Sequence, residues 1–272
     1  MTDSSGDVDP FEALLAELKP EVIAPKVIEP TADVAVLDPE ETSTILRLSI
    51  RESLFRVTGG ATVELGDDPL KVVILKAAPL SRMYYSEAYA SKAPTCWSTD
   101  AGGGLPAIQV PIDNRQAAAC LNCPQDIRGS GNGSSKACRY QQRLAVMLAD
   151  KDGVLQLNQV CQLSLPATSV FAKDKKKKGL QTYAKLIQDQ GALLSMILTE
   201  LSFDKDSSTP KLCFRPSRVL TDAEIEVVKD VQKDPQTKRL ITFNPKPYVD
   251  DGPSMDNVFS TVKGDGVYVR SL

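Results

Sequence analysis

Apolar and polar residues alternate along the middle of the chain with the period of two that is typical of β-strands. The segment 46–51 shows this alternation clearly, and the apolar run 72–75 predicts a strand that is more completely buried. Two further strands are predicted within 197–203 and 212–214. These patterns predict a core built mainly from β-strands.

The clearest predicted hairpin spans residues 144–165. Alternating apolar residues from Leu144 to Leu148 lead into the turn sequence Asp-Lys-Asp-Gly at 150–153. After the turn, five apolar residues at odd-numbered positions are expected to share one face of the second strand: Leu155, Leu157, Cys161, Leu163 and Leu165.

Two helices are predicted among the later strands. Apolar residues recur with helical spacing over 180–187, and this stripe ends at Gly191. Thr221 and Glu224 have the spacing of a capping box, which predicts the start of a second helix. The expected fold is therefore mainly β (α+β), an OB-like barrel with a few peripheral helices.

The composition divides the chain into an arm (1–44), a core (45–236) and a weakly ordered tail (237–272). The arm is acidic and rich in proline, and we expect it to be disordered except for a short amphipathic helix at 9–19. That helix would dock through Phe11, Leu14, Leu15 and Leu18. Its target is either a partner protein or the protein's own core.

The net charge of −3 conceals a strong separation of charge along the chain. Residues 1–45 carry 11 acidic side chains against 2 lysines, whereas residues 71–185 carry 16 basic side chains against 7 acidic ones. A local excess of positive charge is the electrostatic footprint of a surface that binds a polyanion. We therefore expect the middle of the chain to carry such a surface.

The chain has six cysteines and no histidine, and four of the cysteines are closely spaced. Cys120 and Cys123 have the C-x2-C spacing with which a single turn supplies two ligands to a tetrahedral metal ion. With Cys96 and Cys138 they predict one structural Zn²⁺ in a lobe at 94–140. The alternative is a set of buried or disulfide-bonded cysteines.

Several other classes of protein are not favoured by the sequence. Without histidine, the usual general base is missing, so we do not expect an enzyme. The glycine-rich stretch 129–136 lacks the Gly-Lys-Ser/Thr ending of a phosphate-binding loop. No apolar stretch is long enough to span a membrane, and the first ten residues are acidic and polar, so a cytoplasmic location is expected.

Basic and aromatic residues are interleaved before and within the predicted zinc lobe, which is typical of single-strand binders. A run of lysines follows at 173–178, although such a run is more often only a solvated loop, and the tyrosines could instead pack in the core. The residues predicted to contact nucleic acid are Arg82, Tyr84, Tyr85, Tyr89, Lys92, Trp97, Arg115, Arg128, Lys136, Arg139, Lys173, Lys175, Lys176, Lys177 and Lys178.

The motifs C-W-S-T-D at 96–100, C-L-N-C-P at 120–124, G-S at 129–130 and K-A-C-R at 136–139 lie between predicted strands. On these motifs, roughly residues 45–220 resemble bacteriophage single-stranded DNA-binding proteins, which are helix-destabilising replication proteins with a zinc module inserted in an OB-fold. The chain departs from this group in two ways. The best-known zinc-containing member uses a histidine ligand, and the acidic segment expected at the carboxyl end lies here at the amino end.

The resemblance implies a protein that coats single-stranded DNA during phage replication, recombination or repair, in the host cytoplasm. It also implies that the acidic arm recruits replication proteins such as a polymerase or a helicase. The competing hypothesis is a zinc-ribbon protein that binds other proteins, such as a transcription cofactor, and does not bind nucleic acid. A preference for DNA over RNA does not follow from the sequence.

Overall fold

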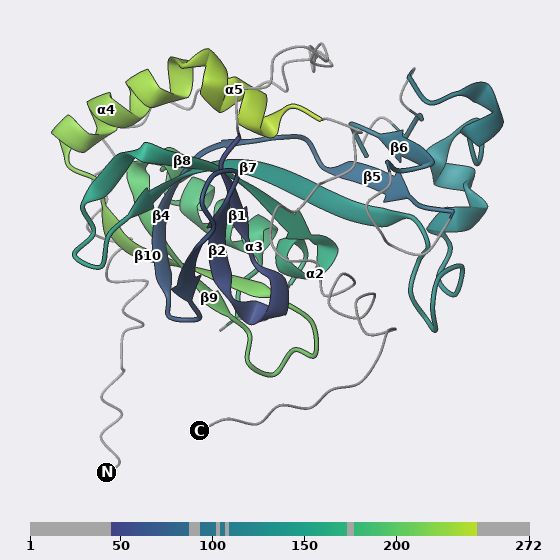
Figure 1. Ribbon diagram of the computed structural model, residues 1–272, viewed down its shortest axis with the longest axis horizontal. Coiled ribbons are helices and arrows are strands. Elements are labelled where there is room, and N and C mark those ends of the chain that lie inside the picture. The colour runs from purple at the N-terminus through teal and green to yellow at the C-terminus, as the bar shows by residue number, and fades with distance from the viewer. Residues whose placement is uncertain (1–44, 87–92, 102–103, 107–108, 173–176, 244–272) are drawn as a thin grey trace, which may run out of the picture.

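The structure is a computed structural model that describes residues 45–86, 93–101, 104–106, 109–172 and 177–243. Ten strands form one sheet, in the order β10-β9-β4-β7-β8-β1-β2-β3, with β5 and β6 joined to it through β7 (Figure 1). All pairs are antiparallel except β1 with β8. The strands are β1 (Arg47–Ser49), β2 (Phe55–Thr58), β3 (Val63–Gly66), β4 (Leu70–Ala77), β5 (Ser81–Tyr84), β6 (Cys96–Ser98), β7 (Arg139–Ala149), β8 (Leu155–Pro166), β9 (Ile197–Phe203) and β10 (Leu212–Val219).

Helices connect the strands and cover the sheet. Two of them, α4 and α5, lie along one side of the sheet, as Figure 1 shows. The helices are α2 (Ala167–Val170), α3 (Leu180–Asp189), α4 (Asp222–Lys233) and α5 (Pro235–Ile241), with short 3-10 turns at η2 (Arg51–Ser53), η3 (Ile112–Asn114), η4 (Cys120–Asn122), η5 (Pro124–Asp126) and η6 (Leu194–Met196).

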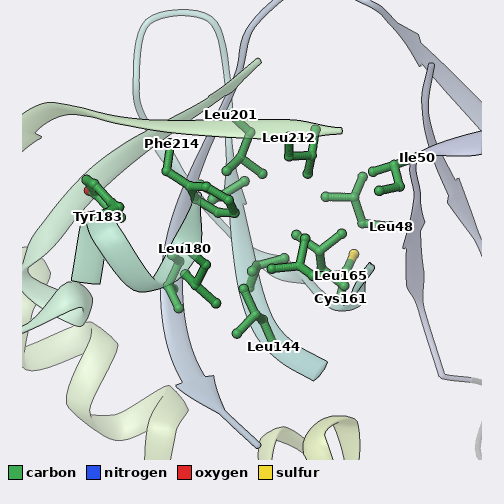
Figure 2. Close-up of a cluster of buried hydrophobic side chains, with 14 of the residues drawn as sticks. Leu48, Ile50, Leu144, Cys161, Leu165, Leu180, Tyr183, Leu201, Leu212 and Phe214 are labelled. Carbon is green, nitrogen blue, oxygen red and sulfur yellow. The ribbon is translucent and has the colours of Figure 1, made fainter. Parts of the chain in front are cut away.

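The sheet curls into a half-barrel around its main core. The rings of Phe55 on β2 and Phe203 on β9 lie 4.4 Å apart, although four strands lie between β2 and β9 in the sheet order. Side chains from both arms of the curled sheet converge on the same apolar cluster (Figure 2). Helix α3 contributes Tyr183, which stacks on Phe214 and shares a 2.8 Å hydrogen bond with the Thr199 hydroxyl.

A second apolar cluster lies between the outer face of the sheet and helices α4 and α5. Strands β4 and β7 place alternate residues on the two faces, so that Val73 and Met147 face these helices while Ile74 and Val146 face the half-barrel interior. Both central strands are therefore buried on both faces. This agrees with the apolar run at 72–75, which predicted a more completely buried strand.

The predicted secondary structure is largely confirmed. The structure is mainly β, the hairpin at 144–165 is formed by β7 and β8, and helix α3 lies where the helical stripe predicted it. The capping box is also present, since the Thr221 hydroxyl accepts a hydrogen bond from the Glu224 amide and the Glu224 carboxylate accepts one from the Thr221 amide.

One face assignment was wrong. Leu163 and Leu165 point into the half-barrel core, but Leu155 packs in the second cluster and the side chain of Leu157 is 56% exposed. The register explains this difference, because β8 has three extra residues between its pairings with Ala149 and Met147. An odd number of inserted residues reverses which face the following side chains occupy.

The boundary of the core after residue 236 was also placed too early. Helix α5 continues to Ile241, with Thr237 and Leu240 buried, and Phe243 is almost fully buried. The arm with its predicted helix at 9–19, including Phe11, Leu14, Leu15 and Leu18, lies outside the described residues. Among the residues described, no helix has the length and apolar character needed to cross a membrane.

Candidate nucleic-acid interface and cysteine lobe

Residues 94–140, here called the cysteine lobe, lie between β5 and β7 at one end of the half-barrel (Figure 1). The lobe begins at the β5–β6 hairpin, in which Tyr84 pairs with Cys96, and then folds into three 3-10 turns. Backbone hydrogen bonds hold these turns together, including 2.6 Å from the Cys120 amide to the Gly104 carbonyl and 2.8 Å from the Cys138 amide to the Gln125 carbonyl.

The four cysteines of the predicted zinc site line one cavity. Cys96, Cys123 and Cys138 are buried, Cys120 is half-buried, and all four have free thiols. The cavity has a volume of about 20 Å³, which is enough for one small atom or ion. The structure therefore brings the four predicted ligands to one cavity.

The donor set fits a single thiophilic ion, but the thiols do not form a coordination shell as they stand. In the described part of the chain, no group of three or more Cys, Asp or Glu side chains is arranged to hold a metal ion. Burial raises the pKa of the Cys138 thiol to about 12, with a further contribution from Asp126, and burial also raises the pKa of Cys120. Without an ion, these two thiols remain protonated at neutral pH.

A buried ion pair joins the lobe to strand β5. Arg82 is only 8% exposed, and its guanidinium donates to the Asp126 carboxylate at 3.0 Å and to the Ala101 carbonyl at 3.1 Å. Asp126 also accepts hydrogen bonds from Lys136 at 2.9 Å and from the Tyr140 hydroxyl at 3.2 Å. Arg82, predicted to contact nucleic acid, thus lies inside the protein as an anchor for the lobe.

The predicted aromatic contacts are also largely internal. Trp97 is buried and its ring stacks on Phe243, with the centroids 6.0 Å apart and the planes at 14°. Tyr84 is half-buried beside this pair, and the half-buried Tyr85 directs its hydroxyl at the Met83 sulfur, 3.7 Å away. As placed, Trp97 has no open face on which a base could stack.

Three of the predicted cations in the lobe are on its surface. Arg115, Arg128 and Arg139 are exposed, and Lys136 is half-buried in its ion pair with Asp126. The Nε of Arg115 also donates a hydrogen bond of 3.1 Å to the Val110 carbonyl, which restrains its guanidinium group. These residues give the lobe an outward-facing positive charge.

An aromatic pair that the sequence analysis missed lies where β7 begins. Phe171 directly follows α2, is 37% exposed, and meets the Tyr140 ring edge to face at 5.9 Å. The Lys136 ammonium lies 5.6 Å from the centre of the same tyrosine ring, and the Arg82 guanidinium lies 4.8 Å from it. The position of Phe171, two residues before the run of lysines, is the sequence signal that could have identified it.

The described lysines of the run differ in their surroundings. Lys177 forms ion pairs with Asp204 and Asp206 in the β9–β10 turn, and the Lys178 carbonyl accepts a 3.0 Å hydrogen bond from the Phe214 amide. Both side chains are half-buried. The remaining predicted contacts lie outside the described residues: Tyr89, Lys92, Lys173, Lys175 and Lys176.

The ends of the lysine run are fixed close to Phe171. The Gly179 amide donates a 3.1 Å hydrogen bond to the Ala172 carbonyl, and a side chain at position 179 would lie 2.7 Å from the Ala172 nitrogen. Glycine is therefore required for this close approach. Phe171, Tyr140 and Lys136 thus lie close to the residues that flank the lysine run, Ala172 and Gly179.

Comparison of the chain with protein-family models, with characterised proteins and with solved structures finds no match.

Proposed function

We propose that the protein binds single-stranded DNA without strong sequence preference. The observation that carries this proposal is the exposed Phe171 set against Tyr140, with Lys136 over the Tyr140 ring and the lysine run 173–178 directly after Phe171 in the sequence. A stacking platform among cations is what binding to single strands requires, since bases stack on the ring while phosphates contact the cations.

The shape of the protein supports this function. A curled antiparallel sheet with a helix beneath it is the architecture of small OB-like barrels, which commonly bind oligonucleotides. On this basis we assign the half-barrel to the OB-like class and its role to phage DNA replication, recombination or repair. The protein would act in the host cytoplasm by binding, without catalysing a reaction, and the acidic arm would recruit a polymerase or a helicase.

Within this proposal, the cysteine lobe holds one structural Zn²⁺ through Cys96, Cys120, Cys123 and Cys138. The ion would supply a closed tetrahedral cross-link between segments that are distant in the sequence. The protein's own residues then orient the binding surface, because Arg139 directly follows Cys138 and Arg128 lies in the turn between Cys123 and Cys138.

A titration of a fluorescently labelled dT oligonucleotide at low and high salt tests the proposal. The wild-type protein should bind at low salt and lose affinity as salt rises, because phosphate contacts release counterions. Phe171→Ala should bind about tenfold more weakly, since stacking on one base contributes about 1–3 kcal/mol.

The matched control is Leu157→Ala, which removes an exposed apolar side chain from β8, outside the proposed interface. It should bind the oligonucleotide as the wild type does, and both variants should keep the wild-type unfolding temperature within a few degrees. Absence of binding by the wild type at low salt would reject the proposal and favour a zinc-ribbon protein that binds only other proteins. A labelled oligo-U in parallel shows whether RNA is also bound.

A further inference from the structure

The cysteine lobe carries an unusual concentration of exposed aliphatic side chains. Among the described residues, the four most exposed large hydrophobic side chains all lie in this lobe, and they are Leu121 at 82%, Ile112 at 80%, and Leu105 and Ile127 at 62% each. Single exposed aliphatic residues are common on protein surfaces, but such a concentration marks an interaction site.

The backbone brings two of these residues together. The Cys120 amide donates to the Gly104 carbonyl, so Leu105 and Leu121 each follow a member of a hydrogen-bonded pair. Leu121 lies in the 3-10 turn η4, and Ile127 directly follows the next 3-10 turn, η5. Packing in the lobe does not explain these residues, because its own apolar cluster consists of Cys96, Trp97, Val110 and Phe243, with Met83 and Tyr84 beside it.

The chain contains a segment with complementary chemistry. The sequence predicts a helix at 9–19 with Phe11, Leu14, Leu15 and Leu18 on one stripe, and Asp9, Glu12 and Glu17 give this segment a net negative charge. On the lobe, the exposed Arg115 follows Ile112 by three residues and the exposed Arg128 directly follows Ile127. The segment 9–19 and the lobe surface are therefore complementary both in charge and in hydrophobic character.

We propose that residues 9–19 bind the exposed aliphatic surface of the cysteine lobe within the same chain. Residues 20–44 connect this segment to the core and can span up to about 80 Å when extended, so the lobe is within reach. A tether of this length holds the segment near the lobe at an effective concentration of about 1 mM. The segment of the same chain therefore outcompetes segments of other copies at micromolar protein concentrations.

This docking does not depend on DNA binding. It implies that a replication protein that binds the same apolar stripe must first displace it from the lobe. Exposure of Leu121 and Ile112 to water would then occur only while a partner holds the arm.

Photo-crosslinking in the full-length protein without DNA tests the proposal. With p-benzoylphenylalanine in place of Phe11, illumination should produce a cross-linked product of monomer size, whose peptides map to residues 105–127 by mass spectrometry. Adding Leu14→Asp should reduce the yield about tenfold, because a charge replaces an apolar contact. Ala16→Asp adds the same charge on the opposite side of the predicted helix and should leave the yield unchanged.

Three outcomes would overturn the proposal: cross-links that map outside the lobe, a product of dimer size in place of the monomer, or equal loss of yield in the two aspartate variants. A dimer-sized product would show that a second copy occupies the surface. Since no oligonucleotide is present, failure here leaves the DNA-binding proposal standing, and failure of the dT titration leaves this one standing.

Discussion

The half-barrel and the cysteine lobe are stabilised in different ways. The half-barrel buries leucine, valine and aromatic side chains almost completely, and central strands β4 and β7 are covered on both faces. The lobe has a small apolar cluster, three 3-10 turns and a buried ion pair, and its larger aliphatic side chains face outward. Hydrophobic burial stabilises the half-barrel, whereas the lobe depends on a few specific polar and thiol groups.

The largest effect should come from removing zinc. If the four thiols hold one ion, metal analysis of the purified protein should find one zinc per chain, and Cys123→Ser should lose it. Structural zinc contributes about 10–16 kcal/mol in small zinc domains, so the lobe should unfold while the half-barrel stays folded. Hydrogen exchange measures both regions, with amides at 120–138 losing protection and those of β4 and β7 keeping it.

Cys213→Ser is the matched control for the zinc experiment, since Cys213 is half-buried on β10, outside the lobe. This variant should retain the metal and the protection of the lobe. A wild-type protein that contains no zinc, or a Cys123→Ser variant with full lobe protection, would contradict the prediction.

The next largest effect should follow from a cavity in the half-barrel. Phe55 is fully buried, so Phe55→Ala should lower the free energy of unfolding by about 4 kcal/mol, as measured by urea denaturation. Val63→Ala on β3, where the side chain is half exposed, should cost less than about 0.5 kcal/mol. Similar losses in the two variants would show that the curled core is not closed around Phe55.

The contrast between regular strands and irregular segments also explains which parts of the structure could be predicted from the sequence. Strand alternation and apolar runs predicted β1, β4, β7, β8, β9 and β10, because burial on a regular strand leaves a local pattern, whereas the short strands β2 and β3 were not predicted. The three extra residues in β8 produce no recognisable pattern in the sequence, so Leu157 was assigned to the wrong face. In a regular element the local pattern is sufficient, whereas an irregular one depends on pairing with a distant strand.

In the lobe, the sequence indicated which cysteines come together but not which cations and aromatic residues remain exposed. Arg82 is buried because Asp126, 44 positions later, and the Ala101 carbonyl accept its hydrogen bonds. Trp97 is buried against Phe243, which belongs to the segment predicted to be a weakly ordered tail. The residue types were those of a binding surface, but their exposure depends on contacts between distant parts of the chain.

The smallest effect, and the most specific to the lobe, is expected for Asp126→Asn. The substitution keeps the shape of the side chain but leaves the guanidinium of Arg82 buried beside a neutral partner, 3.0 Å away in the wild type. Breaking a largely buried ion pair in this way should reduce the free energy of opening of the lobe by about 2 kcal/mol. Native-state hydrogen exchange of the amides at 120–138 measures this change directly.

Glu226→Gln gives the comparison on α4, because Glu226 forms an exposed ion pair with Lys229 at 2.7 Å. An exposed pair contributes less than about 0.5 kcal/mol, so this variant should leave all exchange rates nearly unchanged. In Asp126→Asn the amides of β4 and β7 should also exchange at wild-type rates, since the ion pair lies outside both main apolar clusters. If the amides of β4 and β7 instead exchange faster by the same factor as those of the lobe, the half-barrel and the lobe unfold as one unit. The two regions would then differ in composition but not in their free energy of opening.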